Sequence, residues 1–278
     1  MTIGEVVRTS AEYLARKGVP SPRVDAEHLV AKALGLSRLD LYLHFDQPLT
    51  EEELDRCRAL VRRRGRREPL AYVLGEWGFR RLLLKVDRRA LVPRPETEIV
   101  VERCLALLAS LEQPQALDVG CGSGAIALAL ADEHPNLHVT AIDVSPDALA
   151  LAAENAARTG LSGRVRFLRH DLFAGLPGGP YDLVVSNPPY VDPDDLPSLQ
   201  PEVRDWEPRE ALVGRGATEM VARGARQVLR PGGWLVLEVA DGTSRRVAEL
   251  LASLGFADVR RTEDLAGRER VVEGKWTR

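Results

Sequence analysis

From about residue 115 onward the sequence alternates short apolar runs with amphipathic helical segments, and this alternation constrains the fold more than any other feature. Strands that alternate with helices are typical of a mostly parallel sheet covered on both faces. We predict strands at 115–119, 138–142, 165–168, 181–186, 234–239, from 256 and at 270–273, and helices at 125–132, 145–159, 217–229 and 243–254. The predicted fold class is therefore α/β.

The N-terminal part has a different pattern, because its apolar residues recur at helical spacing. Ser21-Pro22 is a helix start signal, and Thr50-Glu51-Glu52-Glu53 has the residue types of a capping box. We predict a small helical-bundle domain at 1–75, a β-hairpin linker at 76–93 and an α/β domain at 94–278.

The linker contains two apolar stretches, 79–86 and 90–92, which we interpret as hairpin strands that turn near Asp87-Arg88-Arg89. Pro93-Arg94-Pro95-Glu96-Thr97-Glu98 then opens a helix, because a proline stands early and carboxylates fill the first turn. This helix is predicted to begin the larger domain.

A glycine-rich turn, Asp118-Val119-Gly120-Cys121-Gly122-Ser123-Gly124, follows the first strand of the larger domain. Glycines there let the backbone turn tightly and let a ligand approach it closely. Asp143 ends the next strand, where a carboxylate can accept both hydroxyls of a ribose. The spacing Gly120-x-Gly122-x-x-Ala125 also fits a dinucleotide fingerprint. The glycines alone therefore leave a nicotinamide cofactor, S-adenosylmethionine and a plain tight turn open.

Two features favour S-adenosylmethionine. Asp118 lies inside the end of the first strand, where its charge can organise a methionine amino group but would not help a pyrophosphate. The proline-rich loop after the fourth strand is not needed for hydride transfer. After the third strand, Asp171 and Leu172 lie where they would contact the edge and the face of an adenine ring. Asp171 can accept from the exocyclic amine or simply cap a helix.

The loop Asn187-Pro188-Pro189-Tyr190 follows the apolar run 181–185. Two successive prolines cannot continue a ladder of hydrogen bonds, so the strand must stop at Asn187. Open α/β sheets place their ligand crevice at this edge. We interpret the loop as a holder for a planar, nitrogen-bearing group.

The glycine turn, Asp143 and the Asn187–Tyr190 loop together resemble class I S-adenosylmethionine-dependent methyltransferases of the amino-methylating group, which have a Rossmann-like fold. Four further segments narrow the resemblance to the PrmC/HemK family: Glu68–Gly75, Leu91–Glu98, Glu207–Leu212 and Asp264–Val271. Members of this family methylate the side-chain amide nitrogen (N5) of glutamine in the Gly-Gly-Gln motif of bacterial class 1 peptide chain release factors. The resemblance covers nearly the full length and implies the same activity, tuning translation termination.

The resemblance also implies site residues. The cofactor would be S-adenosyl-L-methionine, with S-adenosyl-L-homocysteine as product. Its site would comprise Gly120, Cys121, Gly122, Ser123, Gly124, Asp143, Leu172 and Asn187. We add Asp171 to this site because it follows the third strand. The glutamine would be held by Asn187, Pro188, Pro189 and Tyr190, of which Asn187, Pro188 and Tyr190 are the expected catalytic residues. The helical domain is expected to dock the release factor.

The sequence departs from the family pattern at a few positions. Some relatives carry tryptophan where this chain has Leu172, and the usual residues are replaced at Ala240, at Thr243 and in the segment 214–218. The Leu172 departure predicts weaker stacking on the adenine. The others concern loop shape and partner docking rather than the chemistry.

The expected chemistry follows from the weakness of an amide nitrogen as a nucleophile, because its lone pair is delocalised into the carbonyl. Positive charge builds on the nitrogen as it attacks the methyl group. The Asn187 side-chain oxygen and the Pro188 carbonyl would accept its hydrogens and stabilise that charge. Tyr190 would pack on the amide plane, and no strong general base is needed.

Composition helps to weigh the rival functions. A net charge of −3 and an aromatic content of 5% speak against the nearest rival, an amino-methyltransferase acting on a base of rRNA, tRNA or DNA. We therefore expect no direct nucleic-acid binding, and we interpret the basic run 62–67 as a solvated helix end. Two more distant rivals are a catalytically silent module that docks translation factors and an NAD-dependent oxidoreductase.

The cysteine, histidine and hydropathy patterns indicate the cellular compartment and whether a metal or a membrane is expected. The 3 cysteines are widely spaced, which favours a reducing cytoplasm. The 5 histidines have no ligand spacing with cysteines, so we expect no metal. No apolar run approaches the roughly 20 residues that cross a bilayer, so we expect no membrane partner. We expect a monomer.

Overall fold

The computed structural model describes residues 1–214 and 216–278. It divides into two compact units, one made of Met1–Glu76 and Leu199–Trp206, the other of Trp77–Ser198 and Glu207–Arg278. We call them the helical unit and the sheet unit. Arg215, within the 214–218 departure from the family pattern, lies outside the described residues.

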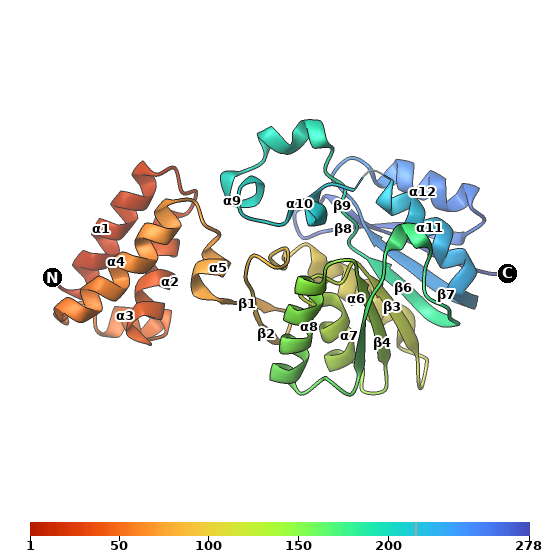
Figure 1. Cartoon of the computed structure of the whole chain (residues 1–278), viewed down its shortest axis with the longest axis horizontal. Helices are drawn as coiled ribbons and strands as arrows, with labels where there is room; N and C mark the ends of the chain where they lie inside the picture. The colour runs from red at the N-terminus through yellow and green to blue at the C-terminus, as the bar shows by residue number, and fades with distance from the viewer. Residues whose placement is uncertain (215) are drawn as a thin grey trace. The chain divides into compact units, whose positions relative to one another are not determined.

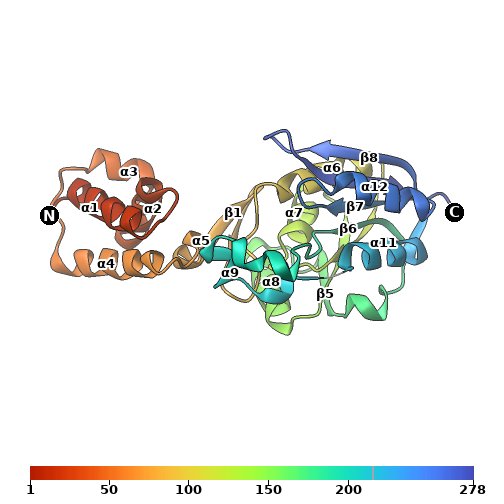
Figure 2. The ribbon, with the colours of Figure 1, turned by 90° about the horizontal axis from the view of Figure 1, so that it is seen from above.

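The helical unit is a small bundle of helices (Figure 2). Its apolar core includes Leu14, Leu29 and Leu54. Its helices are α1 (Ile3–Arg16), α2 (Pro22–Leu34), α3 (Arg38–Leu43), α4 (Glu51–Gly65), α5 (Leu70–Leu74) and α9 (Pro201–Arg204). The predicted capping box at Thr50 is confirmed, since Thr50 and Glu53 bond each other's backbone N–H groups. Ser21 precedes α2 but makes no side-chain cap hydrogen bond.

The short helix α9 belongs to the helical unit although its sequence follows the sheet-unit strand β6. Glu202 on α9 pairs with Arg64 at 2.8 Å and with Arg67 at 2.6 Å. Arg64 also pairs with Asp25 at 2.7 Å, and both of these side chains are buried. The basic run ends α4, as predicted, but the prediction that it is solvated was wrong for Arg64, which is buried. Three arginines of the run (Arg63, Arg64 and Arg67) pair with carboxylates of the unit.

The sheet unit contains a seven-stranded, mostly parallel sheet with the order β5-β4-β3-β6-β7-β9-β8 (Figure 1). Its strands are β3 (Gln115–Val119), β4 (His138–Asp143), β5 (Val165–Arg169), β6 (Tyr181–Ser186), β7 (Leu229–Glu238), β8 (Ala257–Glu263) and β9 (Glu269–Lys275). In this sheet β9 pairs antiparallel with β7 and β8, whereas β3 pairs parallel with β4 and β6, β4 with β5, and β6 with β7. The predicted fold class is confirmed, although β7 begins five residues before the predicted start at 234.

Helices cover both faces of this sheet. They are α6 (Thr97–Leu108), α7 (Ala125–Glu133), α8 (Pro146–Thr159), α11 (Ala217–Val228) and α12 (Ser244–Ser253). The unit also contains the short helix α10 (Arg209–Leu212) and the 3-10 turns η1 (Leu172–Ala174) and η2 (Pro193–Ser198). Side chains alternate along each strand. Thus Leu183 and Val185 pack in the core with α6 and α7, while Val184 packs in the core with α11 and α12. Among the described residues, no helix is long and apolar enough to cross a bilayer.

The predicted hairpin exists, but its predicted strands were wrong. The strands are β1 (Glu76–Phe79) and β2 (Leu82–Lys85), which turn at Arg80 rather than near Asp87. Arg80 has a φ of 53°, and its backbone N–H is held by Glu98 while its guanidinium pairs with Glu133. At the predicted turn, the Asp87 side chain does accept from the Arg89 N–H. However, residues 90–92 form no strand.

Candidate active site

A cavity of about 430 Å³ lies at the carboxyl ends of β3, β4 and β6. The chain runs from β3 outward through β4 and β5, and β6 lies on the other side of β3, so the cavity occupies the switch point of the sheet. It is lined by the turn after β3, the ends of β4 and β6, the segment 89–97 and part of α10. All of these lie in the sheet unit.

The glycine turn forms one wall. Gly120, Cys121, Gly122 and Ser123 line the cavity, and a Cβ added at Gly120 would meet no atom within 4 Å. Gly120 has a φ of +75°, so it supplies the left-handed turn and leaves space for a ligand. Gly124 is not among the lining residues. A Cβ there would lie 3.2 Å from the Ala152 Cβ, so Gly124 permits close packing against α8.

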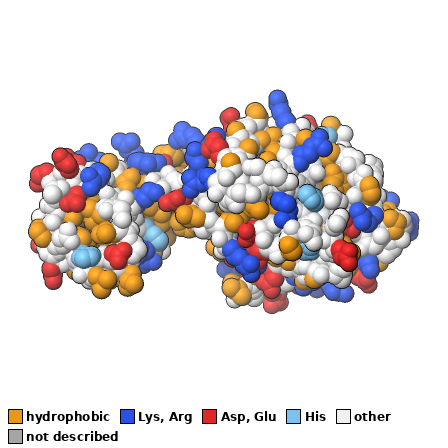
Figure 3. Space-filling model, turned by 90° about the horizontal axis from the view of Figure 1, so that it is seen from below, with side chains coloured by type: hydrophobic (Ala, Val, Ile, Leu, Met, Phe, Trp, Pro, Cys, Tyr) orange, Lys and Arg blue, Asp and Glu red, His pale blue; other side chains and the backbone are white. Residues whose placement is uncertain are grey.

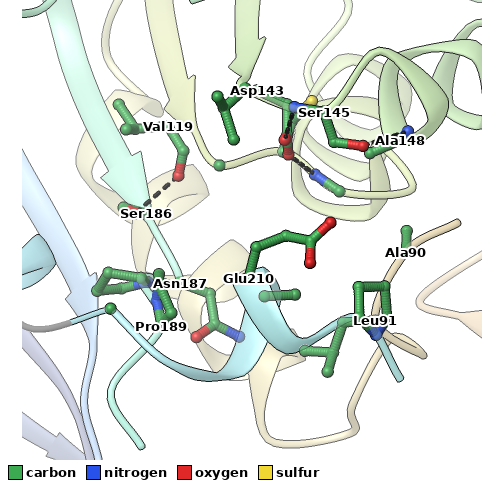
Figure 4. A pocket seen from close by; sticks show the side chains of 18 of the residues that line it. Ala90, Leu91, Val119, Asp143, Ser145, Ala148, Ser186, Asn187, Pro189 and Glu210 are labelled. Carbon is green, nitrogen blue, oxygen red and sulfur yellow. Dashed lines mark hydrogen bonds between the residues drawn. The ribbon is translucent and has the colours of Figure 1, made fainter. Parts of the chain in front are cut away.

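Asp143 lies at the cavity edge of β4 and is already oriented by two backbone donors. Its Oδ2 accepts from the Gly122 N–H at 2.9 Å and its Oδ1 accepts from the Ser145 N–H at 2.9 Å (Figure 4). Two carboxylate oxygens have about four acceptor sites, so acceptor capacity remains for a ligand. Burial raises the pKa of Asp143, and the nearby Glu210, which also lines the cavity, adds to the rise. The carboxylate is thus positioned to accept hydroxyl donors from a ligand.

Asp118 has a different place from the one expected. It is fully buried and is not among the residues lining the cavity. Its Oδ2 accepts from the Ala127 N–H at 3.1 Å, whereas Oδ1 has no partner among the described residues. Burial raises the pKa of Asp118 to about 7. Its geometry shows a carboxylate that organises the start of α7 rather than one that faces the cavity.

Asp171 and Leu172 both line the cavity, as does the exposed Phe173. The Asp171 side chain accepts from the Phe173 N–H at 2.9 Å and so caps η1. This is the capping role that the sequence left open, and it still leaves the residue at the cavity wall.

The loop after β6 forms the opposite wall. Asn187, Pro188 and Pro189 line the cavity, and Figure 4 shows Asn187 and Pro189 across from Asp143. The preceding Ser186 donates to the Val119 carbonyl at 2.7 Å, which ties the ends of β6 and β3 together. Tyr190 is 43% exposed and is not among the lining residues. Its packing on a substrate amide stays a prediction.

Gly214 allows the loop to sit close to the segment after α10. A Cβ at Gly214 would lie 2.3 Å from the Pro189 Cγ, a contact that no side chain could make. The neighbouring Val191 N–H donates to the Leu212 carbonyl at 2.9 Å. These contacts fix the outer side of the proline pair.

An ion pair joins two of the segments that carried the family resemblance. Arg94 donates to Glu207 at 2.5 Å, and the other oxygen of this carboxylate accepts from the Val92 N–H at 3.2 Å. The Glu207 side chain is almost completely buried. The stretch 90–92 therefore contacts a carboxylate where a hairpin strand was expected.

Behind Asn187 lies a chain of hydrogen bonds that sequence reasoning missed. The Asn187 Nδ2 donates to the Thr97 Oγ1 at 3.4 Å, and the Thr97 hydroxyl donates to the Glu238 Oε2 at 2.6 Å. Neither Thr97 nor Glu238 was predicted to belong to the site. The available signal was that Glu238 ends the strand next to β6, as Asp143 ends the strand next to β3.

The arrangement suits transfer chemistry on a planar polar group. One wall has a turn open to a ligand and an acceptor for hydroxyls, and the other has a carboxamide and proline carbonyls. In the part of the chain that the structure describes, no group of three His, Cys, Asp or Glu side chains is placed to hold a metal.

Known proteins resemble this chain over nearly its whole length. The sequence matches the family model of the PrmC N-terminal domain at residues 5–75 and that of the methyltransferase small domain at residues 99–200. It is 43% identical to the release factor glutamine methyltransferase of Geobacter sulfurreducens, over 99% of this chain and 96% of that protein. It is 44% identical to the protein of the same name from Chlorobaculum tepidum, over 95% and 93%.

A comparison of structures supports the fold alone. The S-adenosylmethionine-dependent O-methyltransferase of Thermotoga maritima superposes with a TM-score of 0.51 at 16% identity, over 68% of each chain.

Proposed function

The chain belongs to the family of release factor glutamine methyltransferases, and from this premise we propose that it methylates N5 of the glutamine in the Gly-Gly-Gln motif of class 1 release factors. The observation that carries the proposal is the placement of Asn187 and Pro188 across one cavity from Asp143 and the glycine turn. That cavity combines a wall suited to an adenosyl ligand with a wall suited to an amide.

The residues present fit S-adenosylmethionine, which supplies an electrophilic methyl group when it is bound. Asp143 retains acceptor capacity beyond its two backbone donors and would take the ribose hydroxyls. Gly120, Cys121, Gly122 and Ser123 leave backbone open to the cavity. Asp171 and Leu172 would border the adenine, and Gly124 would act indirectly, through the packing of the turn on α8.

The loop after β6 would hold the glutamine side chain. The Asn187 Oδ1 and the Pro188 carbonyl are acceptors, and they would take the two N–H groups of the substrate amide. These acceptors stabilise the positive charge that develops on the nitrogen and orient its lone pair. Fixing the nitrogen close to the methyl group supplies much of the rate acceleration. Pro189 and Tyr190 would complete the glutamine site.

The helical unit is the proposed docking site for the release factor. It exposes several large apolar side chains, including Leu39, Tyr42 and Leu43. Figure 3 shows apolar side chains gathered among charged ones on one face of this unit. Such exposed apolar groups are typical of surfaces that bind other proteins. The sheet unit would carry the chemistry, and the protein would act as a monomer in the cytoplasm, where release factors work.

One experiment tests this function. Purified protein is incubated with S-adenosylmethionine and an unmodified class 1 release factor. The mass of the tryptic peptide that contains Gly-Gly-Gln is then measured by mass spectrometry. We expect the mass of one added methyl group on the glutamine. A release factor with Gly-Gly-Asn in place of Gly-Gly-Gln is the control and should stay unmodified. Transfer of label to rRNA, tRNA or DNA in parallel reactions, with none to the release factor, would overturn the proposal.

A further inference from the structure

We propose that Thr97 and Glu238 are positioning residues, which fix the orientation of the Asn187 carboxamide so that its oxygen faces the substrate. This inference deepens the proposed function and rests on it for the role of Asn187. The three residues come from three places in the sheet unit: Thr97 starts α6, Asn187 directly follows β6, and Glu238 ends β7.

The direction of each hydrogen bond follows from the chemistry of the groups. An ionised carboxylate can only accept, so the Thr97 hydroxyl hydrogen is committed to the Glu238 Oε2 at 2.6 Å. The Thr97 oxygen is then left with lone pairs and accepts from the Asn187 Nδ2 at 3.4 Å. With the nitrogen held on the Thr97 side, the Asn187 oxygen must point the other way.

An asparagine without this support can turn its amide over, because the two ends have nearly the same shape. The reversed amide would present hydrogens to the hydrogens of the substrate amide. It would repel the substrate nitrogen instead of stabilising its developing charge. Thr97 and Glu238 are almost fully buried, so the hydrogen bond between them is largely shielded from water. The chain Glu238–Thr97–Asn187 therefore selects the productive orientation.

The constraint depends on the charge of Glu238. A protonated Glu238 can donate, which would free the Thr97 hydroxyl to donate to Asn187 and would favour the reversed amide. Burial raises the pKa of Glu238 to about 7, with Glu96 at the start of α6 adding to the rise. Arg94 in the preceding segment and Arg270 on β9 oppose the rise, and the Thr97 hydrogen bond does the same. Tyr190 in the loop after β6 is also coupled to Glu238, since burial and then the Glu238 charge raise the pKa of its phenol.

Kinetics of three variants test the proposal against a purely structural role. Thr97→Val keeps the shape but removes the hydroxyl, and we expect kcat for methyl transfer to fall roughly tenfold, as for a lost hydrogen bond. The KM for S-adenosylmethionine should change less than about twofold. Thr97→Ser should return kcat to within about twofold of the wild type. Thr159→Val is the matched control, because its hydroxyl donates to backbone carbonyls of its own helix, α8. It should leave kcat unchanged.

The dependence of kcat on pH gives a second readout. As the pH falls from about 8 to about 6, across the pKa of Glu238, the wild-type kcat should fall with the protonation of this carboxylate. Glu238→Gln keeps an acceptor for Thr97 but does not titrate, so this acid limb should vanish. Wild-type kcat in Thr97→Val, equal damage in Thr97→Ser, or an unchanged acid limb in Glu238→Gln would each overturn the proposal.

A measurement without any substrate separates this inference from the proposed function. The chain has three asparagines, Asn136, Asn155 and Asn187, so protein labelled with ¹⁵N-asparagine gives three side-chain amide pairs. The Asn187 pair, assigned by its loss in Asn187→Asp, should titrate near pH 7 in the wild type but not in Glu238→Gln. If it titrates while the release factor stays unmethylated, the proposed function is wrong and the positioning device stands. If it does not titrate, the device is wrong whatever the substrate.

Discussion

Arg94 and Glu207 lie 113 residues apart in the sequence and are joined by a hydrogen bond of 2.5 Å. The pair holds the segment before α6 against the segment before α10, and both segments line the cavity. Glu207 is the buried partner, and it also accepts from the Val92 backbone. Glu207 thus anchors the cavity wall at both Val92 and Arg94.

Replacing Glu207 should therefore loosen this wall. We expect Glu207→Ala to lower the free energy of unfolding by about 1–3 kcal/mol, because it leaves the Val92 N–H and the partly exposed Arg94 guanidinium without their partner. Affinity for S-adenosylhomocysteine should fall with it. Urea denaturation and calorimetric titration measure the two effects. Glu12→Ala is the control, since its ion pair with Arg8 is exposed on both sides and should contribute less than about 1 kcal/mol. Equal stability of the two variants would contradict this role of Glu207.

Asn187→Ala should impair the chemistry while leaving the fold and the cofactor site in place. We expect kcat to fall on the order of 10²–10³, as when one preorganised polar group that stabilises a transition state is removed. Single-turnover methylation of the release factor measures the loss, and titration with S-adenosylhomocysteine checks that binding is retained. Asn136→Ala, which changes an exposed asparagine distant in sequence from the site, should behave as the wild type. A fully active Asn187→Ala would exclude the proposed role.

Asp143→Ala should weaken cofactor binding rather than catalysis at saturation. Charge-assisted hydrogen bonds contribute about 1.5–3 kcal/mol, so the dissociation constant of S-adenosylhomocysteine should rise roughly ten- to hundredfold. Isothermal calorimetry gives this constant directly. Asp147→Ala removes an exposed carboxylate from the first turn of α8 and serves as the control. An unchanged constant for Asp143→Ala would rule out the ribose assignment.

Because the pKa of Asp118 is raised, we expect the free energy of unfolding of the cofactor-free protein to depend on pH. Its pKa in the folded state is about 7, well above that of an aspartate in an unfolded chain, so the folded state binds the extra proton between these values. The free energy of unfolding should therefore fall as the pH rises from about 5 through about 7.

Asp118→Asn removes this titration but keeps an acceptor for the Ala127 N–H. Relative to the wild type, the variant should gain on the order of 2–3 kcal/mol of stability between about pH 5 and about pH 8. Urea denaturation of both proteins at the two pH values measures the difference, and titrations common to both cancel. Parallel pH profiles would show that Asp118 ionises without cost.

The sheet and much of the cavity wall were predictable because they follow from local patterns. Apolar runs indicated the strands, and the carboxyl ends of parallel strands meet at one edge, which brings Asp143 and Asn187 to the same cavity. The strand register of the hairpin was harder to predict from the sequence. Asp87 does form a local turn with Arg89, but the strands pair around Arg80 because Glu98 and Glu133 hold that residue.

The supporting contacts could not be read from the sequence. Glu207 with Arg94 and Glu238 with Thr97 join positions more than a hundred residues apart, and no periodicity encodes such a pair. The structure also places Asp118 away from the cavity, because its position inside a strand end buries the side chain completely. Orientation of a side chain at a strand end depends on its neighbours, which a single sequence does not supply.

The helix α9 limits how the two units can be separated by truncation of the chain. Because Glu202 pairs with Arg64 and Arg67, the chain returns to the helical unit after β6 before it enters α10. A protein that lacks residues 1–76 would keep α9 but would lose both arginine partners of Glu202. The two units are therefore not interchangeable modules. A helical unit grafted from a relative would have to bring arginines that match the carboxylate at position 202, or the inserted segment would have to be exchanged along with it.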